Sequence, residues 1–226
     1  MPIIAKKPRI SVNKLAEYLE ASPTRRKKII SDAKNPAKFI TTRYTNARDV
    51  IKNYLIAGQD EDYVLESIKE IEEIEAKSDF QEQDKALSIE SLELLLETDF
   101  AVLDECEIIN FDDANKLIEI AGVNISVNPD LVLTKRVGDI THIGAVKLHL
   151  SKSNLLTNES QKIVGVMLHD FTGKFLTKEG ENPNPKLSMS IDVFQATIDC
   201  CPKSYTLRMR TIETACEEIA LWWGKL

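Results

Sequence analysis

The apolar residues of positions 1–57 recur with helical spacing. Ser11 can cap a helix whose inward-facing stripe is Val12, Leu15, Ala16 and Leu19. Ser22-Pro23 opens a second helix, because the hydroxyl accepts an unpaired N–H while proline occupies a position where no N–H is needed. Asn35-Pro36 breaks that helix, and a third is expected from about Pro36 to Leu55. The front of the chain is therefore predicted to be a set of short helices.

Two more helices follow, and then the pattern changes. Gly58-Gln59-Asp60 is expected to be a linker, with helices up to about Lys77 and from Ala86 to Thr98. Between Val123 and Val127 apolar and polar residues alternate, which is the pattern of a half-buried strand. The sheet is therefore expected to begin near Gly122.

The rest of the chain alternates between strand and helix patterns. The expected elements are strands over Asp130–Val137 and Ile140–Leu150, a helix from about Asn158 to Phe171, a strand from Met189 and a helix from Leu207 to Trp223. Gly138-Asp139 supplies the turn between the first two strands. Gln161 has the N3 position of a capping box, and Asn182-Pro183-Asn184-Pro185 is expected to be a loop.

These elements predict an α/β (α+β) protein in two parts. Residues 1–57 are expected to form a basic helical segment. Residues 58–226 are expected to hold acidic helices that lead into a mixed sheet flanked by helices, with the sheet motifs within 123–200.

Charge is distributed unevenly along the chain, whose net charge is −7. Residues 1–53 hold 13 Lys and Arg against 4 Asp and Glu, whereas residues 54–120 hold 4 against 21. Short helices with one basic face favour a small nucleic-acid-binding module, whose exposed cations are Arg25, Arg26, Lys27 and Lys28. The alternative is that the basic and acidic stretches pack against each other.

The sequence holds no run of about 18 apolar residues and no apolar stretch behind the N-terminal cations. We therefore expect no membrane span and a cytoplasmic location. Phosphate loops and dinucleotide-binding glycine motifs are also missing from the sequence.

Two segments carry the chemistry. Asn128-Pro129-Asp130 opens one predicted strand, and Ile143-Gly144-Ala145-Val146-Lys147-Leu148-His149-Leu150 makes up most of the next. Together with the strand, strand, strand, helix, strand order, this resembles the PD-(D/E)XK nuclease superfamily over roughly residues 90–200. The resemblance implies a restriction-endonuclease-like mixed sheet, similar also to the lambda-exonuclease-like members.

What the resemblance implies for the site is a divalent metal, Mg²⁺ or Mn²⁺. In such enzymes the aspartate, here Asp130, and an acid two residues before the lysine bind the metal, and the lysine, here Lys147, assists the attacking water. Magnesium prefers hard oxygen ligands, and a bound metal lowers the pKa of water. Side chains alternate along a strand, so the Asp130 carboxylate can lie near Lys147, with His149 and Ser151 following. The structural alternative is a turn aspartate and an edge lysine.

The departure from the family pattern is Ala145, which occupies the position of the second acid. A methyl group cannot bind metal, so another carboxylate must substitute if the site is active. Candidates are Glu159 at the start of the following helix, and Glu97 or Glu93 from the preceding one. Gln161 could match the glutamine of a Q-x-x-x-Y motif, although Gly165 replaces the tyrosine.

The sequence has one cysteine before the core motifs, Cys106, and three after them, Cys200, Cys201 and Cys216. The ligands of the iron–sulfur cluster in some lambda-exonuclease-like nucleases are divided in the same way. Cys200 and Cys201 are adjacent and no C-x2-C pair is present, so ordinary thiols are expected instead of a cluster.

The leading hypothesis is a metal-dependent nuclease that hydrolyses phosphodiester bonds, DNA in preference to RNA, in phage defence or mobile-element biology. The alternative is a catalytically degenerate nuclease fold that acts as a nucleic-acid-binding or protein-interaction subunit. For a protein partner or a second copy of the chain, the acidic middle and Trp222-Trp223 offer interfaces.

Overall fold

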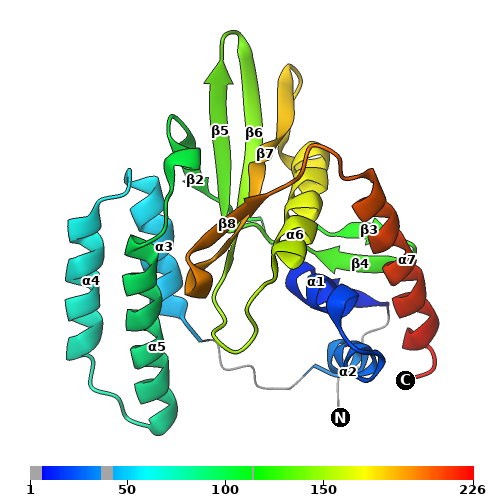
Figure 1. The fold of residues 1–226 in the computed structure, drawn as a ribbon, viewed down its shortest axis with the longest axis horizontal. Helices are drawn as coiled ribbons and strands as arrows, with labels where there is room; N and C mark the ends of the chain where they lie inside the picture. The colour runs from blue at the N-terminus through cyan, green and yellow to red at the C-terminus, as the bar shows by residue number, and fades with distance from the viewer. Residues whose placement is uncertain (1–6, 37–42, 114) are drawn as a thin grey trace.

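The protein has three layers, with helices on both faces of a central sheet (Figure 1). The computed structural model describes residues 7–36, 43–113 and 115–226. The sheet order is β2-β5-β6-β7-β8, from β2 (Glu107–Asn110), β5 (Leu131–Val137), β6 (Ile140–His149), β7 (Glu181–Asp192) and β8 (Thr197–Cys200). Strands β6 and β7 are parallel, and the other three neighbouring pairs are antiparallel. The α/β class predicted from the sequence is confirmed.

A crossover helix connects the two parallel strands. This helix, α6 (Asn158–Phe171), continues into a π-helical turn, Thr172–Leu176, and packs on β6 and β7. Its N-cap is Thr157, whose hydroxyl accepts the N–H of Ser160. The predicted capping box is therefore wrong, because the Gln161 side-chain amide instead donates to Thr197 Oγ1 at 2.9 Å.

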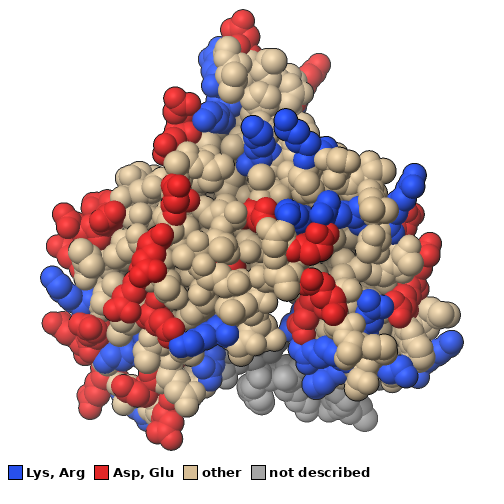
Figure 2. All heavy atoms as spheres, in the orientation of Figure 1, with Lys and Arg blue, Asp and Glu red and all other residues tan. Residues whose placement is uncertain are grey.

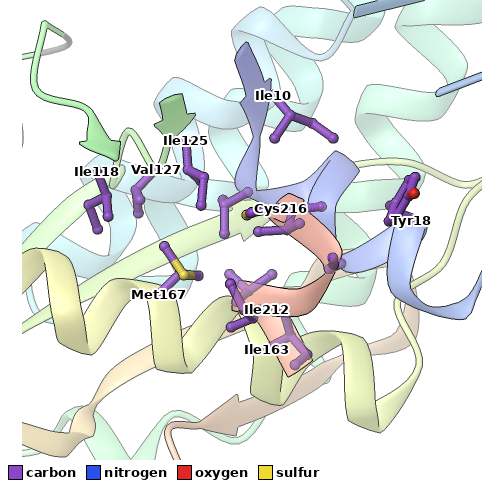
Figure 3. Close-up of a cluster of buried hydrophobic side chains, with 14 of the residues drawn as sticks. Ile10, Tyr18, Ile118, Ile125, Val127, Ile163, Met167, Ile212 and Cys216 are labelled. Atoms are coloured by element: carbon purple, nitrogen blue, oxygen red, sulfur yellow. The ribbon is translucent and has the colours of Figure 1, made fainter. Parts of the chain in front are cut away.

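The first core lies on the α6 side of the sheet. It joins α1 (Val12–Glu20), α2 (Pro23–Lys34) and α7 (Thr206–Trp223) to a small sheet of order β1-β4-β3, formed by β1 (Arg9–Ser11), β4 (Val123–Ser126) and β3 (Ile118–Ile120). Figure 3 shows side chains from these elements meeting, among them Ile10, Tyr18, Ile125, Ile163, Met167 and Ile212. Burial of these apolar side chains is the main stabilising contribution on this side.

The second core lies on the opposite face. Helices α3 (Thr45–Ile56), α4 (Glu61–Glu73) and α5 (Asp79–Leu96), with the short helices Ala101–Leu103 and Val193–Gln195, cover sheet residues such as Leu133, Val146 and Leu148. Residues 7–57 are thus divided, since α1 and α2 belong to the first core and α3 to the second. Gly58 and Gln59, with φ of 86° and 68°, form a tight turn between α3 and α4.

Several predicted boundaries differ from the structure. Helix α4 ends at Glu73 instead of about Lys77, and α5 begins at Asp79 instead of Ala86. The sheets do not begin near Gly122, because β1, β2 and β3 precede it. Ser11 and Ser22 cap α1 and α2 as expected. The third helix begins at Thr45, because Tyr44 is left-handed with φ of 62°; residues 37–42 of that prediction lie outside the described residues. The loop predicted at Asn182–Pro185 is wrong, because these residues lie within β7, where the pairing register with β6 shifts. Within the described residues, no helix is both long and apolar enough to cross a membrane.

Gly165 lets α6 approach the backbone that follows β8. A Cβ at Gly165 would lie 2.7 Å from the Cys201 nitrogen, so neither alanine nor the tyrosine of a Q-x-x-x-Y motif fits without movement. We expect Gly165→Ala to lower the free energy of unfolding by about 1–3 kcal/mol in urea titrations. The matched control is Gly173→Ala, whose Cβ would lie 3.7 Å from the nearest side-chain atom. Equal stability of the two variants would contradict this account.

Candidate functional site

Asp130 and Lys147 meet at one end of the central sheet. The Asp130 N–H donates to the Val146 carbonyl at 2.8 Å, so Asp130 extends the β5–β6 pairing by one residue. Both side chains point to the α6 side of the sheet, because the alternating residues Val146 and Leu148 fill the opposite core. Lys147 Nζ lies 3.3 Å from Asp130 Oδ2.

Lys147 is a largely buried cation. Its Nζ also donates to the Asn128 carbonyl, and 15% of its side chain is exposed. Burial lowers the pKa of Lys147, the Asp130 carboxylate opposes this shift, and the charge of Arg48 adds to it. An unpaired ammonium in this position would be costly, so Asp130 stabilises Lys147 directly.

Arg48 is the site residue that sequence reasoning missed. It projects from α3, and its Nη1 donates to Asp130 Oδ1 at 2.6 Å and to the Leu148 carbonyl at 3.3 Å. Asp130 Oδ2 accepts the Leu148 N–H at 2.8 Å in addition to its contact with Lys147. Both carboxylate oxygens are therefore engaged. No motif in the sequence singles out Arg48 among the other cations of the basic segment.

The candidate second acids lie elsewhere. Glu159, at the start of α6, forms a two-bond ion pair with Arg208, at 2.7 and 2.8 Å. Glu97 caps the end of α5, on the opposite face of the sheet from Lys147, and is exposed like Glu93. Ala145 is fully buried in the first core. The structure thus brings together Asp130 and Lys147, but not Glu159, Glu97 or Glu93.

Metal-binding side chains do not gather in the part of the chain that the structure describes. No group of three or more His, Cys, Asp or Glu residues there is placed to hold a metal ion. The four cysteines are all free thiols, and they divide between the two cores: Cys201 and Cys216 in the first, with Cys106 and Cys200 packed against the second.

His149 is a neutral imidazole that hydrogen-bonds both to α1 and to the loop after β6. Its Nε2–H donates to the Asn154 carbonyl at 2.6 Å, which leaves Nδ1 to accept from the Asn13 amide at 3.3 Å. Burial lowers the pKa of His149; Asp192 raises it, while Arg48 and Lys14 lower it further. Asp192 is itself fully buried, and its Oδ2 accepts the Leu156 N–H at 2.7 Å. Ser151 lines a pocket beside His149.

The basic run of α2 makes mostly intramolecular contacts. Arg25 pairs with Glu17, and Arg26 donates to the Tyr18 and Leu19 carbonyls at 3.0 Å and to Glu218. Lys27 lies over the Trp222 ring, 4.7 Å from its centroid, and Lys28 pairs with Asp32 at 3.2 Å. The four cations therefore do not project together as one face.

Strands β5, β6 and β7 and the crossover helix α6 follow one another as expected, but the first expected strand, Val123–Val127, is β4 of the small sheet, and β2 pairs with β5 in the central sheet instead. Comparisons with family models, with curated proteins and with solved structures found no match to this chain.

Removing Asp130 leaves two neighbouring cations, Lys147 and Arg48, without their shared carboxylate. We expect Asp130→Ala to lower the free energy of unfolding by about 3–5 kcal/mol, because an uncompensated buried charge is costly. The matched control is Glu90→Ala, which breaks an exposed pair with Lys152 and should cost about 1 kcal/mol or less. Urea unfolding measures both changes. Similar losses in the free energy of unfolding would show that the buried cluster stabilises the protein no more than an exposed ion pair does.

His149 should make stability depend on pH. Because burial holds its pKa below 6.5, the unfolded chain binds the proton at higher pH than the folded chain. The contribution of neutral His149 to the free energy of unfolding is complete above about pH 6.5. It is lost as the pH falls from there towards the folded-state pKa. We expect His149→Gln to flatten the slope of stability between about pH 6.5 and pH 5, leaving a part due to His169, whose pKa burial also lowers. An unchanged slope would contradict this role.

Proposed function

We propose that this chain is a nucleic-acid-binding protein whose nuclease-type core does not hydrolyse phosphodiester bonds. The observation that carries the proposal is the closed cluster of Arg48, Asp130 and Lys147. The Arg48 guanidinium lies against Asp130 Oδ1, where the resemblance to PD-(D/E)XK enzymes would put a metal ion.

The residues as placed do not fit a divalent metal. Mg²⁺ requires near-octahedral oxygen ligands and is usually held by one or two carboxylates. Both oxygens of Asp130 already accept hydrogen bonds, and Ala145 offers only a methyl group. Two cations beside a single carboxylate also oppose the approach of a third.

Nucleic acid as the partner is supported by the charge distribution together with the resemblance. Many acidic side chains lie over α4 and α5, on the left of Figure 2, whereas α2 holds five Lys and Arg against one Asp. A polyanion can therefore approach α2 away from the acidic surface of α4 and α5. The resemblance to degenerate nucleases implies a binding subunit in phage defence or mobile-element biology. The location that we propose is the cytoplasm, and the ligand is DNA in preference to RNA.

The test is to incubate labelled single- and double-stranded DNA and RNA with the protein and Mg²⁺ or Mn²⁺. We expect intact substrates together with binding that weakens steeply as salt rises. Electron paramagnetic resonance of Mn²⁺ reports metal binding independently of cleavage, and we expect the wild type and Asp130→Asn to give the same titration.

Cleavage by the wild type that both Asp130→Asn and Lys147→Met abolish would overturn the proposal and establish a metal-dependent nuclease. Absence of binding to every nucleic acid would overturn it in the other direction, in favour of a protein-interaction role.

A further inference from the structure

Two pockets lie next to each other along α1. The first has a volume of about 490 Å³ and lies between α1, Arg48 and the residues that follow β6. The second, of about 580 Å³, lies between α1, β1 and α2. They share the lining residues Ser11, Lys14 and Arg25, and we refer to the pair, from Arg9 to His149, as the groove.

Cations line the whole length of this groove. In order from the β1 end they are Arg9, Lys14, Arg25 and Arg48. Lys14, Arg25 and Arg48 are between 34% and 49% exposed at the side chain, so their charges reach solvent.

The acids that line the groove are engaged with the protein. The carboxylate of Glu20 accepts from the hydroxyls of Thr157 and Ser160 at the start of α6. Glu17 pairs with Lys14 and Arg25, and Asp32 pairs with Lys28. Three of the cations are paired as well, since Lys14 and Arg25 share Glu17 and Arg48 pairs with Asp130. Four cations against three acids, with a neutral His149, give the lining a net charge of +1.

The two halves of the groove differ in chemistry. The half near β1 has an apolar floor formed by Ile10, Ile29 and Ala33. The half near His149 is more polar, since Asn13, Ser151 and Asn154 lie among its lining residues beside Leu150, Leu155 and Leu156. A nucleic acid strand presents both kinds of surface, apolar bases and sugars beside charged phosphates.

We propose that this groove binds a single nucleic acid strand, with phosphates at Arg9, Lys14 and Arg25. Cavities of about 300–1,000 Å³ enclose groups the size of a small molecule. Each half of the groove therefore accommodates one nucleotide of a flexible strand, and a duplex is too wide to enter. Among the described residues, no Phe, Tyr or Trp lines either half, so these residues contact the strand through its backbone, independently of base sequence. This inference rests on the proposed function and names its substrate class and its binding surface.

The experiment is fluorescence anisotropy of oligothymidylate and oligouridylate of about 15 nucleotides, with a duplex of the same length, over a salt series. We expect both single strands to bind more tightly than the duplex. Arg9→Ala and Lys14→Ala should each reduce the slope of log K against log salt by about 0.7, the value for one lost phosphate contact to a single strand.

The matched control is Lys174→Ala, which removes an exposed, ion-paired lysine at the far end of α6 from the groove. It should bind as the wild type does, and urea unfolding checks that all variants are folded. Wild-type binding that neither groove variant weakens would overturn the groove while leaving the proposed function intact. Tighter binding of the duplex would overturn the single-strand assignment, and no binding to any probe would overturn both proposals.

Discussion

A single buried carboxylate holds together two parts of the protein that the sheet would otherwise separate. Asp130 stands at the end of β5, Lys147 on the neighbouring strand, and Arg48 on a helix of the opposite layer. Each cation would be costly to bury alone, so the position of α3 at the end of the sheet depends on the one negative charge between them. The same arrangement that fixes the helix also occupies the oxygens that a metal would need.

The N-terminal helices pack on both faces of the sheet, α1 and α2 in the first core and α3 in the second, and polar contacts fix their positions. Helix α1 reaches the sheet end through Asn13 and His149, and reaches the start of α6 through Glu20. Apolar burial determines which face each helix covers, while these polar contacts determine where along the sheet it lies. The groove is the space left between elements held in this way.

Local patterns predicted the helices and the β5–β6 pair better than the short strands β1, β2, β3 and β8, since caps and periodicity are properties of neighbouring residues. The bounds of α6 and the caps of α1 and α2 follow from such signals. The site was only half predictable: Asp130 and Lys147 lie on adjacent strands, but Arg48 is 82 residues from Asp130 and follows no motif. Asn182–Pro185 has loop composition, yet a shift in register with β6 retains it in the sheet.

The contact between Glu20 and the start of α6 also constrains the order of folding. Glu20 and Ser160 are 140 residues apart, and β1 pairs with β4. Closing loops of this length costs chain entropy before any contact rewards it, so such pairings form late. We therefore expect α1 to dock after the crossover helix α6 has formed, although α1 precedes α6 in the sequence.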